Sequence, residues 1–238
     1  MSPRTQSRGE LTKGLILETA IKLFHERGYE ETTMRSIAER SGVALGNAYY
    51  YFRSKEHLVL AFYQRINALQ MEAAKPILEL ETSLKSRLIG VIRAELAVLE
   101  PYHAFWVSLF KSAADPRSPL NPFSPESEPI RNACMNTFRQ VLSGSKERMP
   151  DDLSSELPRL LWLYHMGVIL FWLHDTSPAR IRTHRLIDQS SDLIIRLNAL
   201  INLPGIGPPL RATIKKLMSE FNNIDSIANA NQSQANAS

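Results

Sequence analysis

Apolar residues recur every three to four positions along most of the chain, a spacing that predicts amphipathic helices. In the first third of the chain it predicts helices over residues 11–27, 33–41, 45–51 and 55–74. Gly28 follows the first of these as a stop signal, and Thr32 or Thr33 can cap the second. Pro76 is expected to end or kink the fourth helix, because proline removes a helical hydrogen bond.

The same spacing continues through the rest of the chain and predicts helices over residues 84–99, 102–114, 130–142, 155–174, 179–203 and 210–221. Five prolines between residues 116 and 129 predict a loop, because no helix tolerates that density of proline. Residues 223–238 are polar and low in complexity, which predicts a disordered tail. No stretch of useful length alternates as a strand does, so the predicted fold class is all-α.

The pattern between residues 33 and 52 predicts two short helices joined by a tight turn. Gly42 lies at the bend, where a positive φ is accessible to glycine at little cost. Apolar residues on both sides of the bend, Ile37, Ala38, Val43, Ala48 and Phe52, can close into one small core. The remaining face of the second helix carries no acidic residue and can donate hydrogen bonds, as a helix in the major groove of DNA must.

This stretch resembles the DNA-binding segment of tetracycline-repressor-like (TetR/AcrR) transcription regulators. The family pattern, T-x-x-x-I-A-x-x-x-G-V-x-x-G-x-x-Y-x-x-F-x-S-K-x-x-L, is matched by Thr33, Ile37, Ala38, Gly42, Val43, Gly46, Tyr49, Phe52, Ser54, Lys55 and Leu58. One position departs, because many members have Ser or Thr where this chain has Ala44. The lost side-chain cap would cost on the order of 1 kcal/mol.

Candidate DNA contacts follow from this alignment. We expect Tyr49 and Lys55 to contact phosphate and Asn47 and Tyr50 to face the groove; the full set is Thr33, Arg35, Ala44, Leu45, Gly46, Asn47, Tyr49, Tyr50 and Lys55. Lysine is disfavoured at the positive end of a helix dipole, so a phosphate near Lys55 would explain its position. A basic arm containing Arg4, Arg8 and Lys13 precedes the first helix and suits a phosphate backbone.

The C-terminal helices predict a homodimer. The helix over 155–174 is apolar nearly all round, so one of its faces needs a partner, and the helix over 179–203 has an apolar stripe. Two such helices from each subunit could form a four-helix interface, as the resemblance implies. Two heads would then read a pseudo-palindromic operator in double-stranded DNA, because one recognition helix contacts too few base pairs for specific binding.

The resemblance also implies a small-molecule effector that relieves repression by binding in the C-terminal domain. The candidate ligand-binding residues are aromatic side chains with a few polar tips: Phe105, Trp106, Phe110, Trp162, Tyr164 and His165. Each of these could equally be plain core. His103 is a further polar candidate with the same alternative. The domains are therefore expected over residues 1–54 (DNA-binding), 55–222 (regulation and dimerisation) and 223–238 (tail).

Composition narrows the remaining classes. The charge of the 238 residues is nearly balanced, with 28 Lys and Arg against 24 Asp and Glu, so only the local basic arm argues for nucleic acid. Cys134 is the sole cysteine and cannot form an intramolecular disulfide, which fits a reducing cytoplasm. The N-terminus has no apolar signal core, and the longest apolar run, over 160–173, is too short to span a membrane.

Two other functional classes were weighed. An enzyme is disfavoured, because His165, His174, Asp175 and His184 lack the spacing of metal ligands, Cys134 has no nearby histidine, and no phosphate loop or nucleophile elbow occurs. No cofactor or metal is expected. The second alternative is a DNA-binding protein without a ligand, whose body only dimerises or binds another protein.

Overall fold

The computed structural model describes residues 8–235 of the chain, with side chains through residue 221. Within that part the chain forms helices and connecting turns and no strand. The elements are α1 (Arg8–Arg27), α2 (Met34–Ser41), α3 (Leu45–Tyr51), α4 (Lys55–Leu80), α5 (Leu84–Leu99), η1 (Glu100–Tyr102), α6 (His103–Ala114), α7 (Glu128–Ser143), η2 (Asp151–Leu153), α8 (Leu157–His174), η3 (Pro178–Arg180), α9 (Ile181–Ile201) and α10 (Gly207–Ala235). The all-α prediction is confirmed.

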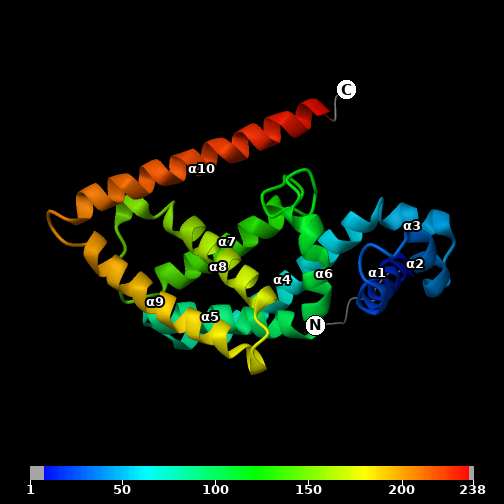
Figure 1. The fold of residues 1–238 in the computed structure, drawn as a ribbon, viewed down its shortest axis with the longest axis horizontal. Helices are drawn as coiled ribbons and strands as arrows, with labels where there is room; N and C mark the ends of the chain where they lie inside the picture. Colours follow the sequence, from blue (N-terminus) through cyan, green and yellow to red (C-terminus); the bar gives the residue numbers. More distant parts are fainter. Residues whose placement is uncertain (1–7, 236–238) are drawn as a thin grey trace.

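Helices α1, α2 and α3 form a small head at one end of the molecule (Figure 1). Ile16 and Phe24 of α1, Ile37 of α2 and Ala48 of α3 are buried together in its core. The head therefore closes around the apolar positions that the sequence pattern places on both sides of Gly42.

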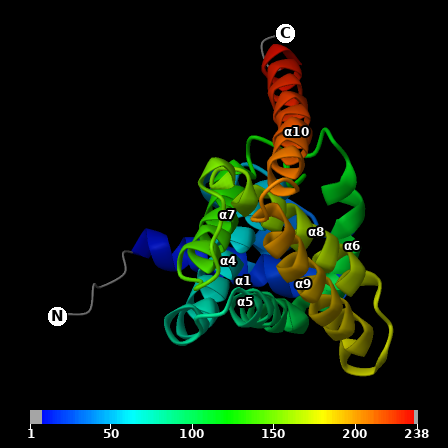
Figure 2. The same cartoon turned by 90° about the vertical axis from the view of Figure 1, so that its left-hand side faces the viewer.

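Helix α4 leaves the head and runs into the body, where it packs against α5 and α7 (Figure 2). It was expected to run to about Ala74, with Pro76 marking its end or a kink, and it continues to Leu80 with Pro76 inside it. The last turn is retained because α5 holds it. Ile77 packs over Gly90, where an added Cβ would lie 2.7 Å from Ile77 Cγ2.

One buried cation ties the ends of two body helices together. Arg87 of α5 is 4% exposed and donates hydrogen bonds to carbonyls at the C-terminus of α4 and to others near the C-terminus of α7. These carbonyls carry the negative end of each helix dipole, so the guanidinium supplies both hydrogen bonds and charge compensation. The resulting clamp, Arg87 with α4 and α7, fixes the far end of the body.

The C-terminal segment differs from its prediction. A short helix over 210–221 and a disordered tail were expected, whereas α10 runs unbroken from Gly207 to Ala235 and packs against α9. No proline or glycine follows Pro209, and alanine, a strong helix former, recurs near the end. In the basic arm, Arg4 lies outside the described residues, whereas Arg8 and Lys13 belong to an α1 that begins earlier than expected.

Candidate functional site

The turn between α2 and α3 has the geometry that its sequence predicts. Gly42 adopts a left-handed conformation with φ of 69°, and its N–H caps α2 by donating to carbonyls of the last turn. Thr33 begins α2: its hydroxyl accepts from the N–H of Ser36 at 3.1 Å, while the Ser36 hydroxyl accepts from the N–H of Thr33 at 3.0 Å. The Thr33 hydroxyl therefore caps α2, and the Thr33 side chain is also exposed to solvent.

Helix α3 presents a polar and aromatic face to the solvent. Tyr50 is 81% exposed and Tyr49 is 48% exposed, whereas Ala48, just before them on the same helix, is fully buried. Asn47 is also exposed, and Ala44 provides no side-chain cap. The face groups the predicted contacts Ala44, Gly46, Asn47, Tyr49 and Tyr50 on one side of the head, with Leu45 half-buried and Arg35 exposed on α2.

Lys55 has a different environment from the one its sequence position suggests. Its ammonium donates to the carbonyls of Tyr29 and Glu30 at 2.8 and 3.2 Å and lies 4.4 Å from the centre of the Tyr29 ring. The Tyr29 hydroxyl in turn donates to Glu56 at 2.8 Å. These bonds give the lysine at the start of α4 partners within the head, whereas its contact with a phosphate stays a prediction. We call Tyr29, Glu30, Lys55 and Glu56 the head lock.

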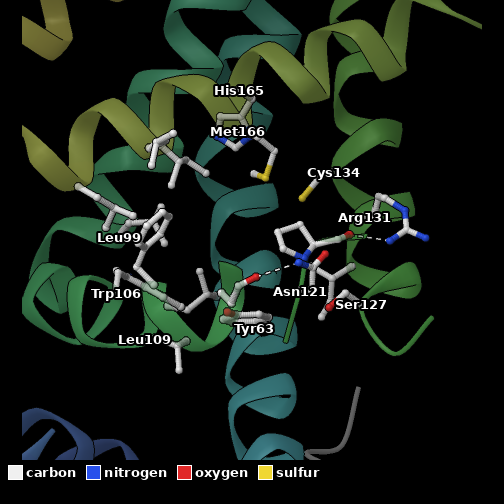
Figure 3. Close-up of a pocket in the computed structure, with 18 of the residues that line it drawn as sticks. Tyr63, Leu99, Trp106, Leu109, Asn121, Ser127, Arg131, Cys134, His165 and Met166 are labelled. Carbon is white, nitrogen blue, oxygen red and sulfur yellow. Dashed lines mark hydrogen bonds between the residues drawn. The ribbon is translucent and has the colours of Figure 1, made fainter. Parts of the chain in front are cut away.

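A cavity of about 440 Å³ lies in the body between α4, α6, α7 and α8 (Figure 3). Its walls are mainly apolar, and its size falls in the range of small-molecule sites. Among the lining residues are Tyr63, Ile66, Asn67, Gln70, Leu99, Trp106, Leu109, Phe110, Ile130, Arg131, Cys134, Trp162, His165, Met166 and Ile169. The geometry therefore offers a mainly apolar site with a few polar groups.

The proline-rich loop predicted between residues 116 and 129 forms one wall of this cavity, and it gives way to α7 at Glu128. Asn121, Pro122, Phe123 and Ser127 line it. The Asn121 amide donates to the carbonyl of Ala113 at 3.1 Å (Figure 3), and Arg131 donates to the carbonyl of Pro122 at 2.6 Å. The loop is therefore an ordered wall tied to α6 and α7.

Four of the six predicted ligand-binding residues line the cavity: Trp106, Phe110, Trp162 and His165. Phe105 does not, because it is one position from Trp106 and so points about 100° away around α6. Tyr164 does not either, since it is one position from His165 and faces α9, where its hydroxyl lies 2.7 Å from that of Ser190. The predicted placement of these two side chains in the ligand site was wrong. His103 contacts Trp172, with ring centres 4.6 Å apart.

The polar residues that α4 contributes to the cavity were missed. Tyr63, Asn67 and Gln70 share one face of α4, and the latter two are less than 10% exposed. The available signal was a polar stripe at i, i+4 and i+7 within an otherwise apolar helix, which is unusual for buried positions.

Aromatic rings connect the cavity to the head. Trp106, which lines the cavity, stacks on Phe62 of α4 with ring centres 5.4 Å apart. Phe62 contacts Phe105, and Phe105 stacks on Phe24 of α1 at 5.7 Å. We call Phe24, Phe62, Phe105 and Trp106 the aromatic bridge. It is a continuous packed contact from the cavity wall to the head.

Two other kinds of site are absent from the part of the chain that the structure describes. No group of three or more His, Cys, Asp or Glu residues there could hold a metal ion. No helix among those residues has the length and apolar character needed to cross a membrane.

Both halves of the chain match known protein families. Residues 16–62 match the family described as bacterial regulatory proteins of the tetR family, and residues 87–206 match the tetracyclin repressor-like C-terminal domain. Over 123 residues the chain is 30% identical to the HTH-type transcriptional repressor KstR2 of Mycolicibacterium smegmatis, a match covering 52% of this chain and 60% of that protein.

Solved structures have the same fold. The fatty acid degradation regulator FadR from Bacillus halodurans superposes with a TM-score of 0.60 at 16% identity, covering 79% of this chain and 96% of that one. FadR from Bacillus subtilis, solved in complex with stearoyl-CoA, has a TM-score of 0.58 at 17% identity, covering 75% and 96%. Together with the matches along both halves of the sequence, these findings place the protein in the TetR family of helix-turn-helix, DNA-binding transcription regulators.

Proposed function

We propose that the protein is a repressor that binds a pseudo-palindromic operator as a homodimer and is released from it by a small apolar or aromatic molecule in the body cavity. Its place of action would be the cytoplasm, where its DNA lies. The observation that carries the proposal is the aromatic bridge, because it joins a ligand-sized cavity to the DNA-binding head through packed side chains.

The DNA-binding surface in this proposal is the exposed face of α3 with the start of α2. Asn47 and Tyr50 are placed to reach base edges, and an amide can pair with the edge of adenine. Tyr49 and Arg35 are placed to reach phosphates. Lys55 belongs to the head lock and acts by holding the turn between α1 and α2 against the start of α4.

The proposed dimer surface is the outer face of α8 and α9. Leu170 and Phe171 of α8 are 44% and 40% exposed, and Leu193 and Leu197 of α9 are 57% and 46% exposed. Large apolar side chains exposed on two packed helices favour a protein–protein contact there, and Leu170 also lines the cavity. Gly167 lies at the middle of the α8 face with no atom within 4 Å of an added Cβ, so a partner helix could approach closely there.

The turn between α8 and α9 holds that surface in shape. One carboxylate oxygen of Asp175 accepts two hydrogen bonds from Ser177, and the other accepts two from Thr183, at 2.6 to 2.9 Å. Although burial opposes ionisation, these bonds hold the pKa of Asp175 well below its usual range. The two helices thus present one preformed face to a partner.

Release would follow from displacement of α6. A ligand that fills the cavity contacts Trp106, and any shift of α6 moves Phe105 against Phe24 and Phe62. The ligand can change the spacing of the two heads only to the extent that it binds one spacing better than the other. Phe24, Phe62 and Phe105 are buried and Trp106 is partly buried against them, so such a shift is transmitted as a rigid displacement.

Selection of bound sequences from random duplex DNA tests the proposal most directly. We expect an inverted repeat bound by two copies of the chain, with the copy number measured by light scattering on the complex. A selected sequence without symmetry, or a single copy per site, would contradict it. Melting temperatures against a metabolite library test the effector, and a library with no stabilising compound would favour a regulator without a ligand.

A further inference from the structure

The cavity contains a buried acid–histidine pair. His165 of α8 lines it and is 2% exposed, and Glu95 of α5 behind it is 3% exposed. Nε2 of His165 lies 3.0 Å from an oxygen of Glu95, close enough to share a proton, although the ligand-free arrangement is not a well-aligned hydrogen bond. Figure 3 places His165 beside Met166, at the opposite end of the drawn cluster from Tyr63.

Apart from Nε2 of His165, which lies beside Glu95, two ring nitrogens of cavity-lining residues have no hydrogen-bond partner among the described residues. They are Nδ1 of His165 and Nε1 of Trp106, which come from different helices. A buried polar group without a partner costs roughly 1–3 kcal/mol, so such groups normally have an occupant. The wall around them is apolar, and the indole nitrogen can only donate.

The protonation of the pair decides what Nδ1 offers. Burial raises the pKa of Glu95 to about 8 and lowers the pKa of His165 to about 4, so at neutral pH the pair carries no net charge. A carboxyl group donates to an imidazole nitrogen more strongly than it accepts from one. A Glu95 carboxyl that donates to Nε2 across this 3.0 Å gap places the remaining imidazole hydrogen on Nδ1. Transfer of the shared proton to His165 leaves that hydrogen in place.

We propose that the cavity selects an uncharged effector with a mainly hydrocarbon body and a carbonyl oxygen, as in a ketone, ester or thioester, which accepts from Nδ1–H of His165 or Nε1–H of Trp106. This inference rests on the proposed function, because it names the effector class of the same cavity. A hydrocarbon of equal shape leaves both donors unpaired. It should therefore bind roughly ten- to a hundredfold more weakly.

The surroundings of the pair favour a neutral ligand over an anion. Burial raises the pKa of the Cys134 thiol on α7 to about 12 and raises the pKa of the Tyr63 hydroxyl on α4, so both are uncharged at neutral pH. Asn67 and Gln70 of α4 carry no charge. Arg131 is the cation of the lining, and it already donates to the carbonyls of Pro122 and Ser124 in the loop wall.

The first experiment measures the imidazole tautomer of His165 in the ligand-free protein by long-range ¹H–¹⁵N NMR at pH 7. A resonance assigned by its loss in a Glu95→Leu/His165→Phe double variant should show the Nδ1–H tautomer. The double variant replaces both members of the pair by apolar groups, so neither is left buried alone. An Nε2–H tautomer would overturn the inference and leave the proposed function intact.

The second experiment compares three probes of similar shape by titration calorimetry: benzophenone, diphenylmethane and diphenylacetate. We expect benzophenone to bind at least tenfold more tightly than the other two. That preference should shrink in the double variant and in Trp106→Phe, while diphenylmethane affinity is retained as a check on folding. Equal affinities in the native protein, or tightest binding of diphenylacetate, would overturn the inference.

A pH series separates this donor from ordinary packing. Above about pH 8 the pair loses one of its two protons. The hydrogen that remains then lies on Nε2, where it is donated to the Glu95 carboxylate, and Nδ1 becomes an acceptor. Benzophenone affinity should therefore fall between pH 7 and pH 9 in the native protein and stay constant in the double variant. An unchanged native affinity would count against the proposal. Binding of none of the probes, with a palindromic operator still selected, would instead reject the cavity as the effector site.

Discussion

Replacing Arg87 by methionine should destabilise the protein far more than any surface arginine can. The guanidinium donates to the carbonyls of Leu78, Glu81 and Gln140, each at 2.7 Å, and to that of Val141 at 2.9 Å. Hydrogen bonds to a charged group contribute about 1.5–3 kcal/mol each, and the buried cation costs several kcal/mol in desolvation. Subtracting the desolvation cost from the sum of the four hydrogen bonds leaves an expected loss in the free energy of unfolding of about 3 kcal/mol.

The assay is equilibrium unfolding in urea followed by circular dichroism, at fixed protein concentration because any dimer makes stability concentration-dependent. In thermal unfolding the same loss lowers the melting temperature by about 6–12 °C for a chain of this size. Arg93→Met on the same helix is the matched control. Its partner Asp188 lies 2.8 Å away with both side chains more than 40% exposed, so its loss should stay below about 1 kcal/mol.

Gly144→Ala gives an independent check of the clamp. An added Cβ at Gly144 would meet the guanidinium of Arg87, so the side chain would have to leave some of its carbonyl partners. We expect part of the Arg87→Met loss from this single methyl group. A loss below about 1 kcal/mol for Arg87→Met, with an unchanged dependence on urea, would refute the reasoning.

Three further predictions concern function. Arg35→Ala should reduce the salt dependence of operator binding by about one unit because it removes a phosphate contact, whereas Lys55→Met should lower affinity without changing that slope; equal slopes for both variants would reject the distinction. Leu193→Glu with Leu197→Glu should give a monomer by sedimentation, while Leu217→Glu on α10, 53% exposed, should leave a dimer. Phe105→Leu should preserve operator affinity but weaken ligand-induced release, measured by fluorescence anisotropy, and full release in this variant would exclude the aromatic bridge as the route.

The head was predictable because its determinants are local. Gly42 sets a left-handed cap, Ala48 is small enough for the helix crossing, and both act within a few residues of their neighbours. The role of Lys55 was not predictable, because its partners Tyr29 and Glu30 are some 25 positions away and are backbone carbonyls. No side-chain pattern encodes such a contact.

The cavity was predictable only in part for the same reason. Aromatic residues on α6 and α8 indicated its walls. Trp106 and His165 line the cavity, however, whereas their immediate neighbours in the sequence, Phe105 and Tyr164, do not. Which of two adjacent side chains faces the cavity depends on the rotation of each helix, and tertiary packing sets that rotation. Pro76 shows the same limit, because contacts with α5 hold a turn that proline alone would have ended.

The exposed face of α3 has a consequence for how such regulators diversify. Asn47, Tyr49 and Tyr50 contribute nothing to the buried core of the head, which rests on Ala48. In the proposed function, the side chains that read the operator are therefore different from those that bind the effector. Exchanging these three residues should redirect the protein to a new promoter while it still answers the same chemical signal, so one sensor can be reused across a genome.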